Sequence, residues 1–126
     1  EKVVFTGVQK AVEWFYAASD VLVFPSFYEA SSLVLIEAMA SGLPVIASRT
    51  GGAEDFIRDG RNGFLLSSFE NIVEELSSKM EWFLRNRSRR QEMGEKARET
   101  ALAYSWDRVV RETLAVYGQI LRTREC

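Results

Sequence analysis

Two carboxylates, Glu29 and Glu37, have the spacing to hold the two ends of one elongated ligand. Glu29 lies in a loop directly before a helix predicted over 32–41, and Glu37 is the one charged residue within that helix. At about 1.5 Å per helical residue, the two side chains are expected to lie roughly 8–12 Å apart. Because carboxylates accept hydrogen bonds from hydroxyl groups, the pair suits a ligand with hydroxyls at both ends.

The start of the same helix adds an anion-binding position between the two carboxylates. The first backbone N–H groups of a helix have no intrahelical partner, and they favour phosphate. Here those groups come from about Ser31, Ser32 and Leu33. A ligand with phosphates in its middle and hydroxyls at its ends would therefore match the whole stretch.

The surroundings of Glu37 leave alternatives open. The helix over 32–41 is apolar on nearly all sides, which is typical of a helix enclosed by protein. An enclosed carboxylate is unfavourable unless it is hydrogen-bonded, yet no Lys, Arg or His lies between Lys10 and Arg49. Glu37 therefore either meets a residue from elsewhere or faces a crevice and holds a ligand. The plain structural alternatives are a cap on another loop for Glu37 and an ordinary loop acid for Glu29.

The elements that must position these residues alternate between strand and helix, which predicts a Rossmann-like α/β parallel sheet with flanking helices. Short apolar runs predict strands at 3–6, 21–24, 45–47 and 64–66. Helices are predicted between them at 9–19, 32–41 and 53–58, and from about residue 70 the pattern becomes all helix. Ligands of open parallel sheets bind outside the carboxyl ends of the strands, where Glu29 is expected.

Composition excludes several classes of function. The 126 residues suffice for one domain with its own core, and the net charge of −2 gives no reason to expect a nucleic-acid partner. The chain has no histidine and one cysteine, Cys126. Ser-His and Cys-His nucleophilic catalysis and a His/Cys zinc cluster are therefore not expected.

The ordered set of motifs resembles glycosyltransferase family 4. The two glutamates, with seven residues between them and followed by AMASGLPVI at 38–46, are similar to the signature of that family. The flanking motifs follow in the family's order: VFTG at 4–7, ASDVLVFPS at 18–26, GGAE at 51–54, DGRNGFL at 59–65 and YSW at 104–106. The glutamate pair alone is a weak pattern, whereas the ordered set covers nearly the whole chain.

The resemblance implies a fold and a reaction. Members have the two-domain GT-B architecture, so residues 1–126 would form a partial, truncated C-terminal domain that binds a nucleotide sugar, followed by C-terminal helices from about residue 70. The reaction implied is transfer of a hexose-type sugar from a nucleoside diphosphate to an acceptor, with retention of anomeric configuration. The resemblance also implies that no metal is required, and no cofactor is expected, because the nucleotide sugar is itself a substrate.

Roles for individual residues are also implied by the resemblance. Glu29 matches the residue at the donor sugar that is assigned to catalysis, and Glu37 matches the residue that binds the nucleotide ribose. Backbone N–H groups at Ser31, Ser32 and Leu33 match positions that meet phosphate or sugar. A nucleobase pocket is implied at Gly7 and Val8.

Two departures from the family pattern set further expectations. Ala30, Ser31 and Ser32 stand where the family has Gly-Phe-Gly, which leaves the identity of the donor open. Two preceding strand–helix units with a basic pair, and the acceptor-binding domain, have no match in the chain. We therefore expect an N-terminal domain or partner chain to supply them and the chain alone to be inactive. We also expect self-association at the open sheet edge.

Two other functions are compatible with the same fold. One is a non-catalytic nucleotide-binding or regulatory subunit, which the Ala-Ser-Ser variation and the missing basic pair favour. The other is a GT-B-like sugar-nucleotide epimerase, whose acid and base side chains we do not find. A cytoplasmic location is expected, with peripheral attachment of the full-length enzyme to a membrane as the alternative.

Overall fold

The computed structural model describes residues 3–67 and 69–123. At its centre lies a three-stranded parallel sheet in the order β1-β2-β3, formed by Leu22–Phe24 (β1), Val45–Ser48 (β2) and Gly63–Leu66 (β3). Val23 lies opposite Ile46, and Ile46 lies opposite Phe64. The predicted α/β parallel sheet with flanking helices is therefore confirmed.

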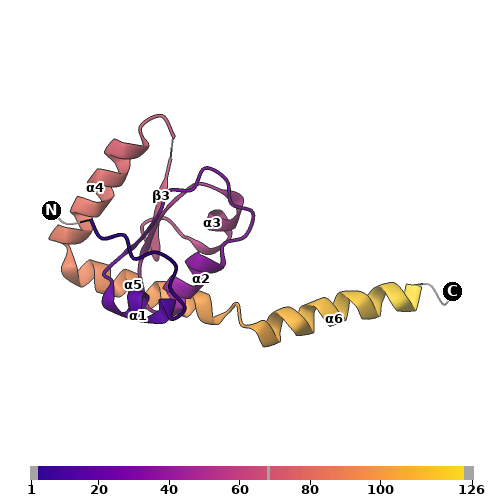
Figure 1. The fold of residues 1–126 in the computed structure, drawn as a ribbon. Coiled ribbons are helices and arrows are strands. Elements are labelled where there is room, and N and C mark those ends of the chain that lie inside the picture. The colour runs from indigo at the N-terminus through magenta and orange to yellow at the C-terminus, as the bar shows by residue number, and fades with distance from the viewer. Residues whose placement is uncertain (1–2, 68, 124–126) are drawn as a thin grey trace.

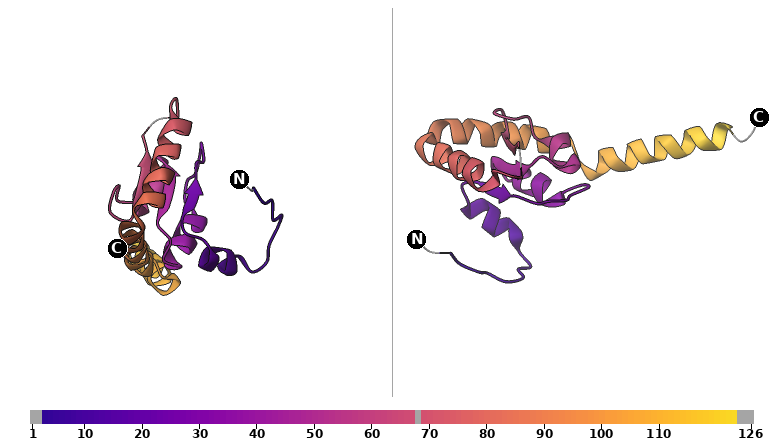
Figure 2. Two further views of the ribbon diagram at one scale, coloured as in Figure 1. Left: turned by 90° about the vertical axis from the view of Figure 1, so that its left-hand side faces the viewer. Right: turned by 90° about the horizontal axis from the view of Figure 1, so that it is seen from above.

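The helices surround the sheet except for the last one, which runs away from the body (Figure 1). Their bounds are Val12–Ala18 (α1), Leu33–Ala40 (α2), Gly51–Phe56 (α3), Ile72–Arg85 (α4), Arg87–Leu102 (α5) and Trp106–Thr123 (α6). Figure 2 shows α4 on one side of the sheet and α1 on the other. The helical stretch expected from about residue 70 consists of α4, α5 and α6.

Both faces of the sheet are covered by apolar side chains. Every residue of β2 is buried, as expected for the central strand of a sheet with helices on both faces. Val45 and Ala47 face a cluster that includes α2, α3 and α5, whereas Ile46 faces a second cluster built with Phe83 of α4. The alternation of side chains along β2 therefore fixes which helices pack on which face.

Helix α2 begins where the sequence predicts. The Ser32 hydroxyl accepts a hydrogen bond from the Leu35 N–H at 3.3 Å, which is the N-cap arrangement. Gly42, with a φ of +83°, follows the helix and terminates it. The start of α2, and with it the first free N–H groups, is thus fixed by local chemistry.

The expectation that α2 is enclosed on all sides is wrong. Leu35, Ala38 and Met39 are fully buried, but Leu33 is 54% exposed and Glu37 is exposed. The reason is that the sheet and α5 pack against one side of α2 and leave the other side open. Glu37 consequently does not carry the full desolvation penalty that an enclosed carboxylate would carry.

The strand predicted at 3–6 is also wrong, so the sheet has three strands where four were expected. Val3, Val4 and Phe5 are 81%, 75% and 94% exposed. A strand exists only where a neighbouring strand pairs with its N–H and C=O groups, and the described sheet ends at β1. The apolar composition of the segment therefore does not make it a strand, and the open edge lies at β1.

Helix α3 starts earlier than predicted, because Gly51 and Gly52 belong to its first turn. The turn after α3 is held by Asn62, which is 1% exposed. Its amide donates to the Phe56 carbonyl and the Thr100 hydroxyl, both at 3.0 Å, and accepts from the Arg58 N–H at 2.7 Å. This one side chain ties the end of α3 to α5.

Helix α5 approaches the end of α2 closely enough to require a glycine. A Cβ at Gly94 would lie 2.2 Å from the carbonyl oxygen of Gly42. Nearby, the Arg98 guanidinium donates to the Ala40 carbonyl at 2.8 Å, so this carbonyl at the C-terminal end of α2 has a hydrogen-bond partner. Helices α5 and α2 are therefore fixed relative to each other at backbone distance.

We expect Gly94→Ala to lower the free energy of unfolding by about 1–3 kcal/mol, because the new methyl group meets backbone that must move. Gly118→Ala is the matched control, since Gly118 also lies within a helix but only the mobile Arg122 side chain comes near it, at 3.8 Å. That change should stabilise α6 by about 0.5–1 kcal/mol. Denaturant unfolding measures both, and equal effects of the two substitutions would contradict the close α2–α5 contact.

Candidate functional site

A hollow of about 700 Å³ lies beside the open side of α2. Three of the residues predicted for a site line it, namely Ser31, Leu33 and Glu37. The rest of the lining comes from α2, from α3 and the segment just after it, and from the start of α6 and the segment just before it: Ile36, Glu54, Asp55, Phe56, Arg58, Tyr104, Trp106 and Val109. The hollow therefore combines carboxylates with aromatic rings, a combination suited to a polar ligand that has flat apolar parts.

Glu37 has a partner from another helix and also faces the hollow. Its Oε2 accepts a hydrogen bond from the Tyr16 hydroxyl at 3.1 Å, and Tyr16 belongs to α1. Burial raises the pKa of Tyr16, and the hydrogen bond to Glu37 raises that pKa further. Tyr16 is therefore a neutral donor at physiological pH. Glu37 therefore meets a residue from another element and also lines a hollow, and its contact with a ligand stays a prediction.

Glu29 lies half-buried in the loop that follows β1. Its Oε1 accepts a hydrogen bond from the Ser31 N–H at 3.3 Å, and its backbone carbonyl accepts from the Gly52 N–H at 3.4 Å. Glu29 itself is not among the residues lining the hollow, whereas Ser31 is. The structure therefore places Glu29 next to the Ser31 end of the hollow and Glu37 further along α2.

The two serines at the start of α2 differ in what they can offer a ligand. Ser32 is 2% exposed and its hydroxyl is already used as the N-cap, whereas Ser31 is exposed. The N–H groups of Leu33 and Val34 belong to the first turn, which has no intrahelical acceptors. An anion at this position would therefore meet backbone N–H groups and the Ser31 hydroxyl.

Gly7 and Val8 lie apart from these residues. Gly7 has a φ of +63°, and Val8 is 100% exposed. Neither residue lines the hollow that contains Glu37. The nucleobase pocket that the resemblance implies at Gly7 and Val8 stays a prediction.

Sequence reasoning missed Tyr16, Arg58, Tyr104 and Trp106. Trp106 is 72% exposed and lines the hollow. The motif YSW at 104–106 was a usable signal for Tyr104 and Trp106, since it belongs to the ordered set of family motifs. No local pattern joins Tyr16 to Glu37, because 21 residues separate them.

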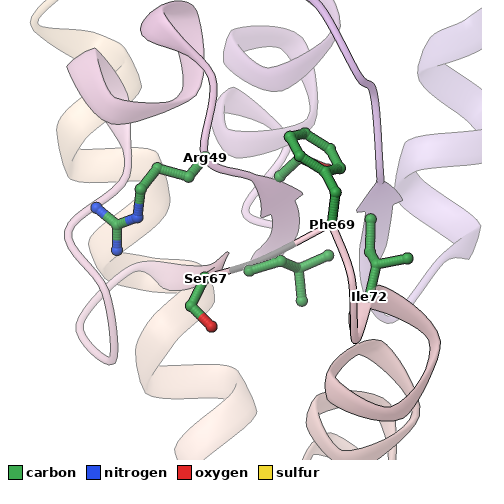
Figure 3. Close-up of a pocket in the computed structure, with 6 residues that line it drawn as sticks. Arg49, Ser67, Phe69 and Ile72 are labelled. Atoms are coloured by element: carbon green, nitrogen blue, oxygen red, sulfur yellow. The ribbon is translucent and has the colours of Figure 1, made fainter.

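A second, smaller hollow of about 100 Å³ lies at the carboxyl ends of β2 and β3. Figure 3 shows Arg49 and Ser67 on one side of it and Phe69 and Ile72 on the other. The Arg49 guanidinium is paired with Glu54 at 3.0 Å. The volume is large enough for a few waters and too small for a nucleotide, so we assign the candidate site to the larger hollow.

Within residues 3–67 and 69–123, no three or more Asp, Glu, His or Cys side chains form a group that could hold a metal ion. In the same part of the chain, no helix combines the length and the apolar character needed to cross a membrane.

Comparison with known proteins gives one family. The family model described as glycosyl transferases group 1 matches residues 1–100. Sulfoquinovosyl transferase SQD2 of Arabidopsis thaliana is 42% identical over 108 residues, which cover 82% of this chain and 21% of the relative. The chain therefore spans about a fifth of the length of that relative.

Two solved structures have the same fold over most of the chain. Sucrose-phosphate synthase from Thermosynechococcus elongatus superposes with a TM-score of 0.81 at 30% identity, covering 89% of this chain and 28% of that one. HepE of Anabaena, solved in complex with UDP-glucose, gives a TM-score of 0.79 at 26% identity, covering 89% and 32%. The sheet with its flanking helices thus resembles the C-terminal, Rossmann-like domain of GT-B proteins.

We expect Gly52→Ala to disturb the loop that carries Glu29. A Cβ at Gly52 would lie 2.9 Å from the Ser31 Cα and 3.1 Å from the Ala30 carbonyl oxygen. Because both atoms are backbone, the loop must shift, which should lower the free energy of unfolding by about 1–3 kcal/mol.

Gly51→Ala is the matched control for Gly52→Ala, since no atom lies within 4 Å of a Cβ at the neighbouring position. Denaturant unfolding and the amide chemical shifts of Ala30 and Ser31 measure the effect. Equal changes of these chemical shifts in Gly52→Ala and Gly51→Ala would contradict the close contact between α3 and the loop.

Proposed function

We propose that this chain, which belongs to the glycosyl transferases group 1 family, binds the nucleoside-diphosphate sugar donor of a retaining glycosyltransferase. The observation that carries the proposal is the hollow beside α2, which is lined by Ser31 and Leu33 at the start of this helix and by Glu37 further along it. The complex of the related HepE with UDP-glucose supports a nucleotide sugar as the ligand.

Each part of the ligand has a counterpart in the proposal. The Glu37 carboxylate accepts hydrogen bonds from the vicinal ribose hydroxyls. The N–H groups of the first turn of α2, at Leu33 and Val34, meet the diphosphate, with the Ser31 hydroxyl beside them. Glu29 lies at the donor sugar, on the other side of Ser31. The order of groups along α2 then matches the order of groups along a nucleotide sugar.

Catalysis in this proposal consists largely of positioning and charge stabilisation. The bond between the anomeric carbon and the diphosphate breaks, and negative charge collects on the diphosphate. The first turn of α2 stabilises that charge through its N–H groups and the positive end of the helix dipole. Basic residues outside this chain complete the stabilisation, and no metal ion is required.

The acceptor is bound by a domain or a partner chain beyond residues 1–126. This part of the proposal rests on length, since the chain covers only 21% of the related sulfoquinovosyl transferase. The isolated chain should therefore release no UDP from UDP-glucose above background, with or without candidate acceptors. Steady UDP release by purified 1–126 would contradict this expectation.

A non-catalytic nucleotide-binding subunit is the second candidate. Ala30, Ser31 and Ser32 replace the two glycines expected before α2, and Ser32 is buried as its cap, which restricts how closely a donor sugar can approach. Binding of UDP without transfer, in the intact protein complemented by its acceptor domain, would favour this candidate over the transferase.

Glu37→Gln and Glu29→Gln should separate the two ends of the ligand. Hydrogen bonds to charged groups are worth about 1.5–3 kcal/mol, and about 1.4 kcal/mol is a factor of ten in affinity. Glu37→Gln should therefore weaken UDP binding by the intact protein about tenfold or more. Glu29→Gln should leave UDP affinity nearly unchanged and reduce transfer from UDP-glucose.

Titration calorimetry with UDP and a transfer assay measure the two effects, and thermal unfolding without ligand is the control. Glu37 is exposed, and Gln can still accept a hydrogen bond from Tyr16, so the melting temperature should hardly change. Unfolding of the Glu37→Gln protein with unchanged UDP affinity in its folded fraction would instead make Glu37 a structural residue.

A further inference from the structure

Helix α1 is held on the body of the protein mainly through one side chain. Of its residues, Val12 to Ala18, only Tyr16 is partly buried, and the others are exposed. The ring of Tyr16 packs against the apolar cluster that includes Leu35 and Met39 of α2. The hydroxyl at the end of the same side chain donates to Glu37. The position of α1 and the position of the Glu37 carboxylate therefore depend on the same residue.

The hydrogen bond from Tyr16 also decides how Glu37 can be used. It occupies Oε2, while Oε1 has no hydrogen-bond donor among the described residues. No ion pair of the described part of the chain includes Glu37. Arg58, the cationic side chain among the residues that line the hollow, instead donates to the carbonyls of Glu54 and Asp55 at the end of α3. The orientation of the carboxylate thus rests on a neutral donor.

We infer that Tyr16 is a positioning residue for the nucleotide, which holds Glu37 in place for the ribose and couples the docking of α1 to the binding of ligand. This inference rests on the proposed function and goes beyond it, because it adds Tyr16, a residue that none of the family motifs in the sequence includes. The neutral hydroxyl fixes one carboxylate oxygen and leaves the negative charge available to hydroxyls of the ligand, which a Lys or Arg partner would neutralise.

The first test is Tyr16→Phe in the intact protein, with UDP as the probe. The substitution keeps the ring and its packing and removes only the hydroxyl. UDP affinity should fall about threefold to tenfold. This is the size expected when a hydrogen bond to a charged group is lost and the lost bond acts on the ligand only through that group, here the Glu37 carboxylate. Tyr117→Phe, which removes a hydroxyl from a tyrosine that is 59% exposed on α6, should leave the affinity unchanged.

A double-mutant cycle separates positioning from simple stabilisation. In a Glu37→Ala background no carboxylate remains to be positioned, so Tyr16→Phe should cause no further loss of UDP affinity. A purely structural role would lower the melting temperature equally in both backgrounds and leave the affinity of the folded protein unchanged. An equal loss of affinity in both backgrounds, or no loss in either, would overturn the inference.

Hydrogen exchange in the unmodified protein tests the coupling between α1 and ligand binding. Saturating UDP should slow amide exchange across α1 in this protein. In Glu37→Ala, the control, UDP should have little effect on the exchange of α1. Unchanged exchange in α1 of the unmodified protein would overturn the coupling even if UDP binds. Failure of UDP, GDP and ADP to bind the unmodified protein would overturn the proposed function, and the inference with it.

Discussion

The hydrogen bond from the Leu35 N–H to the Ser32 hydroxyl fixes the start of α2, and the rest of the candidate site depends on it. If the register of α2 against the sheet shifted by one residue, its side chains would rotate by about 100°, because there are 3.6 residues per turn. Glu37 would then leave the hollow, and the free N–H groups of the first turn would point elsewhere. The cap at the buried Ser32 thus helps to set the direction of the groups on α2 that we assign to the ligand.

Two further contacts, one near each end of α2, hold this helix in position. The first turn of α3 meets the loop before α2 at backbone distance, which only Gly52 allows. At the other end of α2, Gly94 and Arg98 of α5 meet the backbone of residues 40 and 42. At Gly52 and at Gly94 the contact is backbone against backbone, so these two contacts leave little room for α2 to shift. Such rigidity suits a site whose action consists of positioning.

The open side of α2 explains why an apolar helix carries an exposed glutamate. Packing of Leu35, Ala38 and Met39 against the sheet and α5 supplies the burial that stabilises the helix. The opposite side contributes little to that core and is left to line the hollow with Glu37. The division lets one short helix act both as a core element and as a wall of the site, and it leaves Tyr16 as the link to α1.

Local residue patterns are enough to predict the parallel sheet, the start and end of α2 and the places of the two glutamates along the chain, because a serine cap, Gly42 and short apolar runs act over a few residues. The packing of distant elements accounts for the absence of a strand at 3–6, since a strand needs a neighbour to pair with. It also decided that Glu37 is exposed and receives the Tyr16 hydroxyl, 21 residues away. The exposure of a side chain and its contacts with distant residues depend on how separate elements pack together. The periodicity of a local stretch carries no information about that packing.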